Sequence, residues 1–259
     1  MDETVLITGA SSGIGRELAR CFAGDQSRLI LVARNTDALA TLAAELRLKY
    51  AIEVHVLTAD LSRPETPQKI FADLSAQKIA VDILVNNAGF GAHGAFAALP
   101  LPRQLEMIRV NVAALTELTG LFLPAMLRQN RGGILNVASV AGFLPGPEMA
   151  VYYASKAFVL SFTEALAAEL SATNLKICAL CPGPTDTNFG KVARGEKMRA
   201  MKMSKLTAET VALCGHRAFR KGKVLCVPGW KNQLLIFLVR LLPRSFVRQI
   251  TAFYNRTDK

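Results

Sequence analysis

The segment TVLITGASSGIG, residues 4–15, decides the fold class. Its first five residues are mostly β-branched or apolar and predict a buried strand over Thr4–Thr8. A turn with the spacing G-x-x-x-G-x-G follows, and a helix is predicted over residues 13–23. Glycines in such a turn let the backbone approach a pyrophosphate, whose charge the helix N-terminus stabilises. A plain tight turn is the alternative, but the strand–turn–helix order favours a dinucleotide-binding loop.

Short β-rich runs alternate with helical patterns along the rest of the chain. The predicted strands are residues 4–8, 28–33, 53–57, 81–85, 133–137, 175–181 and 223–227; the helices are 13–23, 37–49, 64–77, 103–128, 152–171 and 207–219. Apolar strands between helices are typical of a parallel sheet covered on both faces. We therefore predict one α/β domain over residues 1–259. It is a single-domain Rossmann fold, doubly wound, with a mostly parallel seven-stranded sheet and helices on both faces.

Composition and charge narrow the class of protein. The 259 residues are 51% hydrophobic and 20% charged, which excludes a disordered chain, and 7% aromatic, which argues against a nucleic-acid stacking surface. The net charge of +11 is concentrated at one end: residues 1–190 hold 15 basic and 17 acidic side chains, whereas residues 191–259 hold 16 and 3. This asymmetry indicates attraction to an anionic partner, such as a phosphorylated substrate, a membrane surface or nucleic acid.

The cysteines and histidines indicate neither a metal site nor a disulfide. Cys178 and Cys181 match C-x-x-C but lie in a predicted strand, where positions i and i+3 point to opposite faces. We therefore interpret them as core residues, and the three histidines match no zinc spacing. The first residues also lack the basic and apolar regions of a signal peptide. These features together predict a cytoplasmic protein.

The end of the second predicted strand carries Ala33, Arg34 and Asn35, with no acid before Asp37. In dinucleotide-binding folds an acid at this place binds the ribose 2′-hydroxyl of NAD, whereas an arginine accommodates the 2′-phosphate of NADP. The planar guanidinium of Arg34 suits a phosphate. We therefore predict NADP(H) as cofactor; a solvated arginine at a strand end is the alternative.

Further motifs follow the glycine-rich loop in a set order. They are Asn86-Asn87-Ala88-Gly89, Asn111, Ser139, Tyr152-x-x-x-Lys156 and Pro182-Gly183. This combination, which spans residues 4–187, resembles the short-chain dehydrogenases/reductases. The resemblance implies an oxidoreductase that transfers hydride between a nicotinamide cofactor and a small molecule, a ketone or aldehyde in one direction and a secondary alcohol in the other. It also implies a homodimer or homotetramer.

Tyr152 and Lys156 are spaced i, i+4 on one predicted helix, so their side chains share a face. A phenol has a pKa of about 10, and a nearby ammonium lowers that pKa by favouring the phenolate. We therefore predict Tyr152 as the acid/base that exchanges a proton with the substrate oxygen. Ser139 ends the fifth predicted strand, at the edge where such sheets bind ligands, and is predicted to hold that oxygen. Tyr153 has no lysine four residues on and is predicted to pack.

The resemblance assigns the rest of the site. It implies that Asn111 joins Ser139, Tyr152 and Lys156 in the catalytic set by supporting a proton-relay water, and that Lys156 bonds the nicotinamide ribose. The cofactor-binding residues are then Gly9, Ser11, Ser12, Gly13, Ile14, Gly15, Arg34, Asp60, Leu61, Asn87, Ala88, Gly89, Tyr152, Lys156, Pro182, Gly183 and Thr185. The catalytic set shows no departure from the family pattern, so we expect an active enzyme.

Residues 186–205 match the mobile substrate lid of the family. The methionines at 198, 201 and 203 adapt to irregular apolar ligands, and Phe90 and residues 143–145 are expected to face the same cleft. The resemblance thus suggests a fairly apolar substrate, either steroid-like or fatty-acyl-like. Methionines that simply pack against the core are the alternative.

Residues 229–259 form a predicted C-terminal helical extension, similar to that of bacterial family members near hydroxysteroid and ketoacyl reductases. An apolar run over residues 231–242 is broken by Pro243, and Arg244, Arg248 and Arg256 follow. A basic amphipathic segment of this kind can lie in a membrane interface. A helix that covers the substrate cleft or a subunit interface is the alternative, and the sequence leaves both open.

Three other functions compete with an NADP(H)-dependent oxidoreductase. The same fold could use NAD, or the chain could be a dinucleotide-sensing regulator without turnover, against which the complete set of Ser139, Tyr152 and Lys156 argues. A nucleic-acid binder would explain the basic tail but not the glycine-rich loop, so no nucleic-acid partner is expected.

Overall fold

A seven-stranded sheet lies at the centre of the molecule. The computed structural model describes residues 3–193, 195, 198–199 and 205–257. The strands are β1 (Thr4–Thr8), β2 (Arg28–Ala33), β3 (Val54–Thr58), β4 (Ile83–Asn86), β5 (Gly133–Val137), β6 (Lys176–Leu180) and β9 (Leu225–Cys226). Their spatial order is β3-β2-β1-β4-β5-β6-β9, and every neighbouring pair is parallel. The predicted sheet is therefore confirmed.

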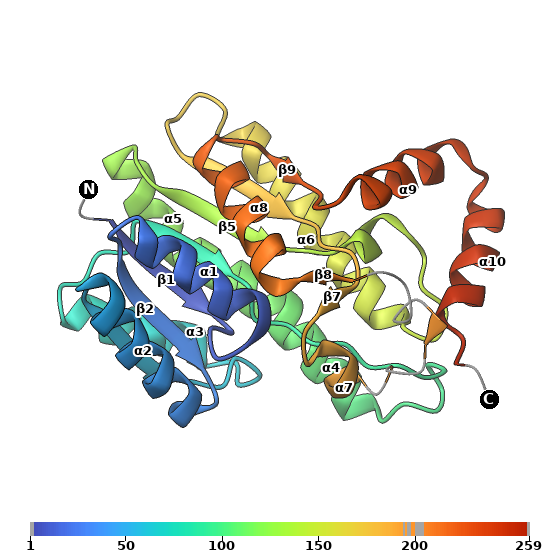
Figure 1. The fold of residues 1–259 in the computed structure, drawn as a ribbon, viewed down its shortest axis with the longest axis horizontal. Helices are drawn as coiled ribbons and strands as arrows, with labels where there is room; N and C mark the ends of the chain where they lie inside the picture. The colour runs from blue at the N-terminus through green and yellow to red at the C-terminus, as the bar shows by residue number, and fades with distance from the viewer. Residues whose placement is uncertain (1–2, 194, 196–197, 200–204, 258–259) are drawn as a thin grey trace.

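Helices cover both faces of this sheet (Figure 1). On one face lie α1 (Gly13–Gly24), α2 (Thr36–Tyr50) and α8 (Ala208–Arg220); on the other lie α3 (Thr66–Ala76), α5 (Ala114–Gln129) and α6 (Ala150–Glu169). Alternate residues of β1 explain this arrangement, because Val5 and Ile7 join one hydrophobic cluster and Leu6 joins the other. The doubly wound fold is thereby confirmed, and so is the placement of Cys178 and Cys181 as buried core residues in different clusters.

The strand order places the ligand-binding edge. The chain builds β1, β2 and β3 in one direction and then returns to place β4 on the other side of β1. Open α/β sheets bind ligands at the carboxyl ends of the strands where the order reverses. The loop after β1 and the loop after β4 therefore meet at the expected binding edge.

The long helix predicted over residues 103–128 is continuous in the structure but changes its winding. It consists of α4 (Leu101–Ile108), a π-helical turn η1 (Arg109–Ala113) and α5. π-turns are rare and frequently occur at functional sites, and this one contains Asn111. By length and composition alone, Leu101–Gln129 would be able to cross a membrane, but Leu118 and Phe122 pack against the sheet as in a core helix.

Some predicted boundaries are wrong by one or two residues. Helix α3 begins at Thr66 with Pro67 in its first turn, because residues 60–66 form a turn in which Thr66 N–H donates to the Arg63 carbonyl.

The predicted lid contains elements that the sequence did not indicate. These are α7 (Phe189–Ala193) and a two-stranded sheet of β7 (Thr185–Asp186) and β8 (Leu206–Thr207), held by pairing between segments far apart in sequence.

The C-terminal extension forms two helices. α9 (Trp230–Leu241) and α10 (Arg244–Asn255) are separated at Pro243, as predicted. Figure 1 shows both at one end of the molecule, beyond the layers that cover the sheet.

Candidate active site

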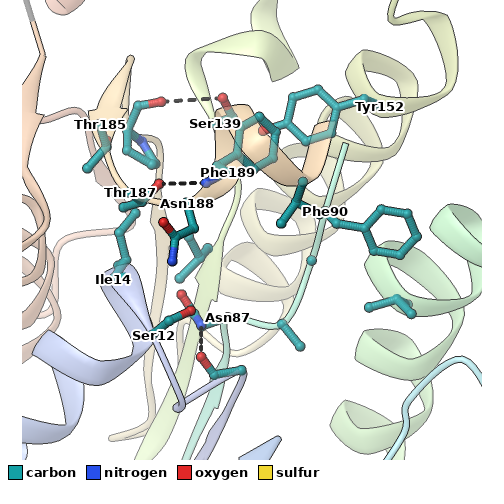
Figure 2. A pocket seen from close by; sticks show the side chains of 18 of the residues that line it. Ser12, Ile14, Asn87, Phe90, Ser139, Tyr152, Thr185, Thr187, Asn188 and Phe189 are labelled. Carbon is teal, nitrogen blue, oxygen red and sulfur yellow. Dashed lines mark hydrogen bonds between the residues drawn. The ribbon is translucent and has the colours of Figure 1, made fainter. Parts of the chain in front are cut away.

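A cleft of about 450 Å³ lies at the carboxyl ends of β1, β2, β4 and β5. Figure 2 shows Ser12 and Asn87 toward one end of this cleft and Ser139, Tyr152 and Phe189 toward the other. All but two residues of the predicted catalytic and cofactor-binding sets line the cleft. Those that line it are Gly9, Ser11, Ser12, Gly13, Ile14, Arg34, Asp60, Leu61, Asn87, Ala88, Gly89, Ser139, Tyr152, Lys156, Pro182, Gly183 and Thr185. The two exceptions, Gly15 and Asn111, contact lining residues from behind.

The glycine-rich loop is fixed to the segment that follows β4. Asn87 Nδ2 donates to the carbonyl oxygens of Thr8 (2.9 Å) and Gly9 (3.1 Å), and Thr8 Oγ1 accepts from the backbone N–H of Asn87 (3.0 Å). Gly15 allows this contact, because a Cβ there would lie 2.4 Å from both Asn87 Nδ2 and the Gly9 oxygen. Asn87 thus holds the loop in shape rather than only lining the cofactor site.

The N-terminus of α1 faces the same cleft. Its N-cap residue, Ser12, makes no side-chain capping hydrogen bond, and the first turn contains no acidic residue. Helix N-terminal N–H groups that no side chain caps are suited to an anion. The loop and this helix end therefore fit the pyrophosphate of a dinucleotide.

Arg34 lies where the sequence predicted, at the end of β2 and on the cleft wall. Its side chain is 62% exposed, and its Nη1 lies 3.7 Å from Oε1 of Glu106. Burial acts to raise the pKa of nearby Asp60, but hydrogen bonds from Ser62 and the charge of Arg34 outweigh it, so this pKa is lowered. Asn35 is occupied in capping α2, since its Oδ1 accepts from Ala38 N–H at 3.0 Å. Arg34 is thus the exposed cation at the adenosine end of the cleft.

Ser139 and Tyr152 meet at the other end. Ser139 caps a 3-10 turn, η2 (Val140–Phe143), where its Oγ accepts from Ala141 N–H at 3.1 Å and donates to the Pro182 carbonyl at 3.3 Å. Burial raises the pKa of Tyr152, and a side-chain hydrogen bond with Ser139 only partly opposes this. The pKa of Tyr152 is therefore raised overall rather than lowered as predicted, because the cost of burying a phenolate dominates.

Lys156 is 5% exposed and donates from Nζ to the Val137 carbonyl oxygen at 2.7 Å. Burial lowers the pKa of its ammonium to about 8. Asn111 Oδ1 accepts from Phe90 N–H at 3.1 Å. A Cβ on Gly89 would lie 3.0 Å from Asn111 Oδ1 and 3.3 Å from Lys156 Nζ, so this glycine leaves a small space between the two polar atoms. Asn111 and Lys156 thus lie near one another, as the resemblance implied.

The sequence motifs did not mark several of the residues that line the cleft. Among them are Met149, Thr187, Asn188 and Asn255. The first three adjoin segments that the motifs marked, so their nearness in sequence was a usable signal. Asn255 had no such signal, because it reaches the cleft from the end of α10. Its Oδ1 accepts from the Tyr153 hydroxyl at 3.0 Å, which also shows that Tyr153 packs and hydrogen-bonds.

Part of the predicted substrate side is corrected. Phe90, Phe189 and Met198 line the cleft, whereas residues 143–145 do not. Phe143 and Pro145 instead line a separate hollow of about 230 Å³ with residues of α9 and α10, because the extension packs over η2. The methionines at 201 and 203 lie outside the described residues.

Comparisons with known proteins agree with this geometry. Residues 3–197 match the model of the family described as short chain dehydrogenase. The chain is 33% identical over 258 residues to a very-long-chain 3-oxoacyl-CoA reductase of Anas platyrhynchos, covering 97% of this chain and 79% of that protein.

Two solved structures share the fold. A short-chain dehydrogenase from Sphingobium yanoikuyae in complex with NADPH superposes with a TM-score of 0.83, at 32% identity, covering 92% of this chain and 93% of that one. A short-chain dehydrogenase/reductase from Burkholderia phymatum in complex with NAD gives 0.82 at 29% identity, covering 100% and 97%. With the glycine-rich loop, the parallel sheet and the pairing of Ser139 with Tyr152, the chain belongs to the short-chain dehydrogenase/reductase family of oxidoreductases.

Proposed function

We propose that this protein is an NADP(H)-dependent oxidoreductase that interconverts a ketone or aldehyde and its alcohol, a secondary alcohol in the ketone case. The observation that carries the proposal is the meeting of Ser139, Tyr152 and Lys156 on one wall of a cleft that also holds the glycine-rich loop. The proposal of NADP(H) over NAD is supported by exposed Arg34 at the end of β2.

Each side chain has its own role in the proposed reduction of a carbonyl group. NADPH, when bound, supplies the hydride. Tyr152 gives its hydroxyl proton to the carbonyl oxygen, and Ser139 donates a hydrogen bond to the same oxygen, which stabilises the charge that develops there. The Lys156 ammonium stabilises the resulting phenolate. The space beside Gly89, bordered by Asn111 Oδ1 and Lys156 Nζ, suits a water that returns a proton.

The raised pKa of Tyr152 suits it to act as the acid in carbonyl reduction. A buried phenol with a raised pKa is protonated at neutral pH, so it enters the reaction as an acid. Oxidation of an alcohol requires the phenolate, which burial disfavours. We therefore propose that Tyr152 is the proton donor when the protein reduces a carbonyl compound near neutral pH.

The substrate end of the cleft supports a fairly apolar compound. Phe90, Met149, Phe189 and Met198 line it and belong to the hydrophobic cluster that includes Tyr152. Aromatic and thioether side chains adapt to flat or flexible apolar ligands. A steroid-like or fatty-acyl-like carbonyl compound suits this lining, and the 3-oxoacyl-CoA reductase among the relatives acts on a compound of the second kind.

An NAD-dependent enzyme is the second candidate, because Glu106 lies 3.7 Å from Arg34 and the Burkholderia phymatum structure holds NAD. A fluorescence titration of the protein with NADPH and then NADH decides between them. We expect NADPH to bind at least tenfold more tightly, a difference of about 1.4 kcal/mol.

The variant Arg34→Asp should reverse this preference, because a carboxylate repels the 2′-phosphate and accepts from a 2′-hydroxyl. Arg103→Gln is the matched control, since Arg103 also pairs with Glu106 but does not line the cleft. Equal binding of both cofactors to the unmodified protein would remove NADP selectivity from the proposal. Binding of neither would contradict the cofactor site itself.

A further inference from the structure

The outer face of α9 exposes a row of large apolar side chains. Trp230, Leu234, Phe237, Leu238 and Leu241 are each between 46% and 69% exposed. Their spacing of i, i+4, i+7, i+8 and i+11 places them on one face of the helix. Ile236, the buried residue of α9, points the opposite way, toward the body of the molecule. The row is therefore a continuous apolar surface without a covering element among the described residues.

Basic side chains border this row on both sides. By helix periodicity Lys231 and Arg240 lie on opposite edges of the apolar face, and exposed Arg244 follows directly after the break at Pro243. Arg240 and Arg244 also line the hollow beside Phe143 and Pro145. None of the three forms an ion pair with a residue in the part of the chain that the structure describes. The sequence contains no acidic residue between Glu209 and Asp258. The border thus has one sign of charge throughout.

The second helix continues this surface. On α10 the buried residues Val247, Thr251 and Asn255 form one face, and Phe246 and Phe253, spaced i, i+7, are about half exposed on another. The extension therefore carries exposed apolar side chains on both helices, with cations at Lys231 and Arg240 of α9 and at Arg244 and Arg248 of α10. This is the composition that binds a bilayer interface, where apolar groups enter the acyl boundary and cations meet anionic headgroups.

We propose that α9 and α10 dock this protein on the surface of an anionic phospholipid bilayer. The charge decides against a second copy of the chain as occupant. In a two-fold contact the same surface meets itself, so Arg240 and Arg244 of both copies would face like charges across an apolar contact. An anionic bilayer supplies an apolar phase and a complementary charge at once. This inference does not depend on the proposed reaction.

The single tryptophan provides a direct measurement. Trp230 is 69% exposed at the start of the apolar row, and the chain has no other tryptophan. We expect its emission to shift to shorter wavelength when the whole protein is titrated with vesicles of phosphatidylcholine and phosphatidylglycerol, and the protein to sediment with them. Partitioning should be at least tenfold weaker into phosphatidylcholine alone, and it should weaken as salt screens the headgroup charge.

Three variants separate the contributions. Phe237→Gln with Leu241→Gln should weaken partitioning at least tenfold, and Arg240→Gln with Arg244→Gln about fivefold for each charge removed. Leu48→Gln is the matched control, because Leu48 is an apolar residue of α2 that is 90% exposed, far from the extension. It should bind vesicles as the unmodified protein does. Thermal unfolding checks that all variants are folded.

Two results would overturn the proposal. One is failure of the protein to bind anionic vesicles, or binding that the Phe237→Gln, Leu241→Gln variant retains in full. The other is a Trp230 shift that appears without lipid as protein concentration rises, together with a doubled mass that the same variant abolishes. That second result would assign the surface to a second copy of the chain. Neither measurement uses cofactor or turnover, so each stands apart from the proposed function.

Discussion

Tyr152 and Tyr153 adjoin one another in the sequence, yet the structure gives them different partners. Tyr152 lies beside Ser139 at one end of the cleft, whereas the Tyr153 hydroxyl donates to Asn255 Oδ1. Successive residues of a helix point about 100° apart, so one helix turn supplies the proposed acid/base and an anchor for the C-terminal extension.

The Tyr152→Phe variant should therefore lose turnover while it keeps cofactor binding. Positioned acid/base groups contribute typically about 10²–10⁴-fold, and we expect kcat with NADPH and a reducible ketone to fall by that range. The NADPH dissociation constant, measured by fluorescence, should change less than about threefold. Full activity of the Tyr152→Phe variant would contradict the proposed mechanism. The control variant, Tyr153→Phe, should keep kcat within about tenfold of the unmodified enzyme.

The pKa of Lys156, which burial lowers to about 8, predicts a pH dependence. Below that pH the ammonium is charged and stabilises the Tyr152 phenolate; above it the charge is lost. We expect kcat for reduction at saturating NADPH to fall by up to ~10-fold per pH unit above about 8. In a Lys156→Arg variant that folds, this decline should be absent, since the guanidinium stays charged. A flat profile to about pH 10 would contradict the assignment.

At the scale of the element, helix α1 contains glycines with opposite requirements. A Cβ on Gly15 would lie 2.4 Å from Asn87 Nδ2 and from the Gly9 carbonyl oxygen. A Cβ on Gly24, the last residue of the same helix, would meet no atom within 4 Å. Gly15 is needed for the close approach of α1, the Gly9 loop and Asn87, whereas Gly24 is not needed for any close contact.

Gly15→Ala should weaken NADPH binding at least tenfold and lower the free energy of unfolding by about 1–3 kcal/mol, because the added methyl displaces the loop. Gly24→Ala should leave binding unchanged and raise that free energy by up to about 1 kcal/mol, since alanine favours the helix. Cofactor titration and chemical denaturation measure both. Equal effects of the two substitutions would show that the packing at Gly15 is not what shapes the site.

At the scale of the whole molecule, the last helix reaches the cleft. Asn255 Nδ2 donates to the Pro147 carbonyl at 2.8 Å, its Oδ1 accepts from Tyr153, and its backbone carbonyl lies 2.8 Å from His93 Nε2. The end of α10 is thus fixed to the substrate side of the site, while Phe246 and Phe253 of the same helix belong to the exposed apolar surface of the extension.

Asn255→Ala removes both side-chain hydrogen bonds and leaves the Tyr153 hydroxyl without its partner. We expect a loss of about 1–3 kcal/mol in the free energy of unfolding, faster proteolysis of α10, and a raised KM for the carbonyl substrate with little change in kcat. Gln249→Ala, at an exposed position of the same helix, is the control and should change none of these. An unchanged KM would mean that Asn255 anchors the helix without shaping the substrate site.

The sequence by itself determined the features that depend on local pattern. The alternation of apolar strands and helices predicted the parallel sheet, the glycine spacing predicted the loop against α1, and the i, i+4 spacing placed Tyr152 and Lys156 on one face. Arg34 at a strand end belongs with these, because its position follows from the end of one strand.

Only the tertiary structure decided features that depend on segments far apart in the chain. The raised pKa of Tyr152 results from burial by α7 and the cleft wall, which no spacing encodes. Asn255 reaches the cleft, and residues 143–145 turn away from it, because of how the extension packs over η2. The apolar face of α9 points outward because the helix packs against the body of the molecule through the side that holds Ile236. Tertiary packing, rather than local sequence, selects that side.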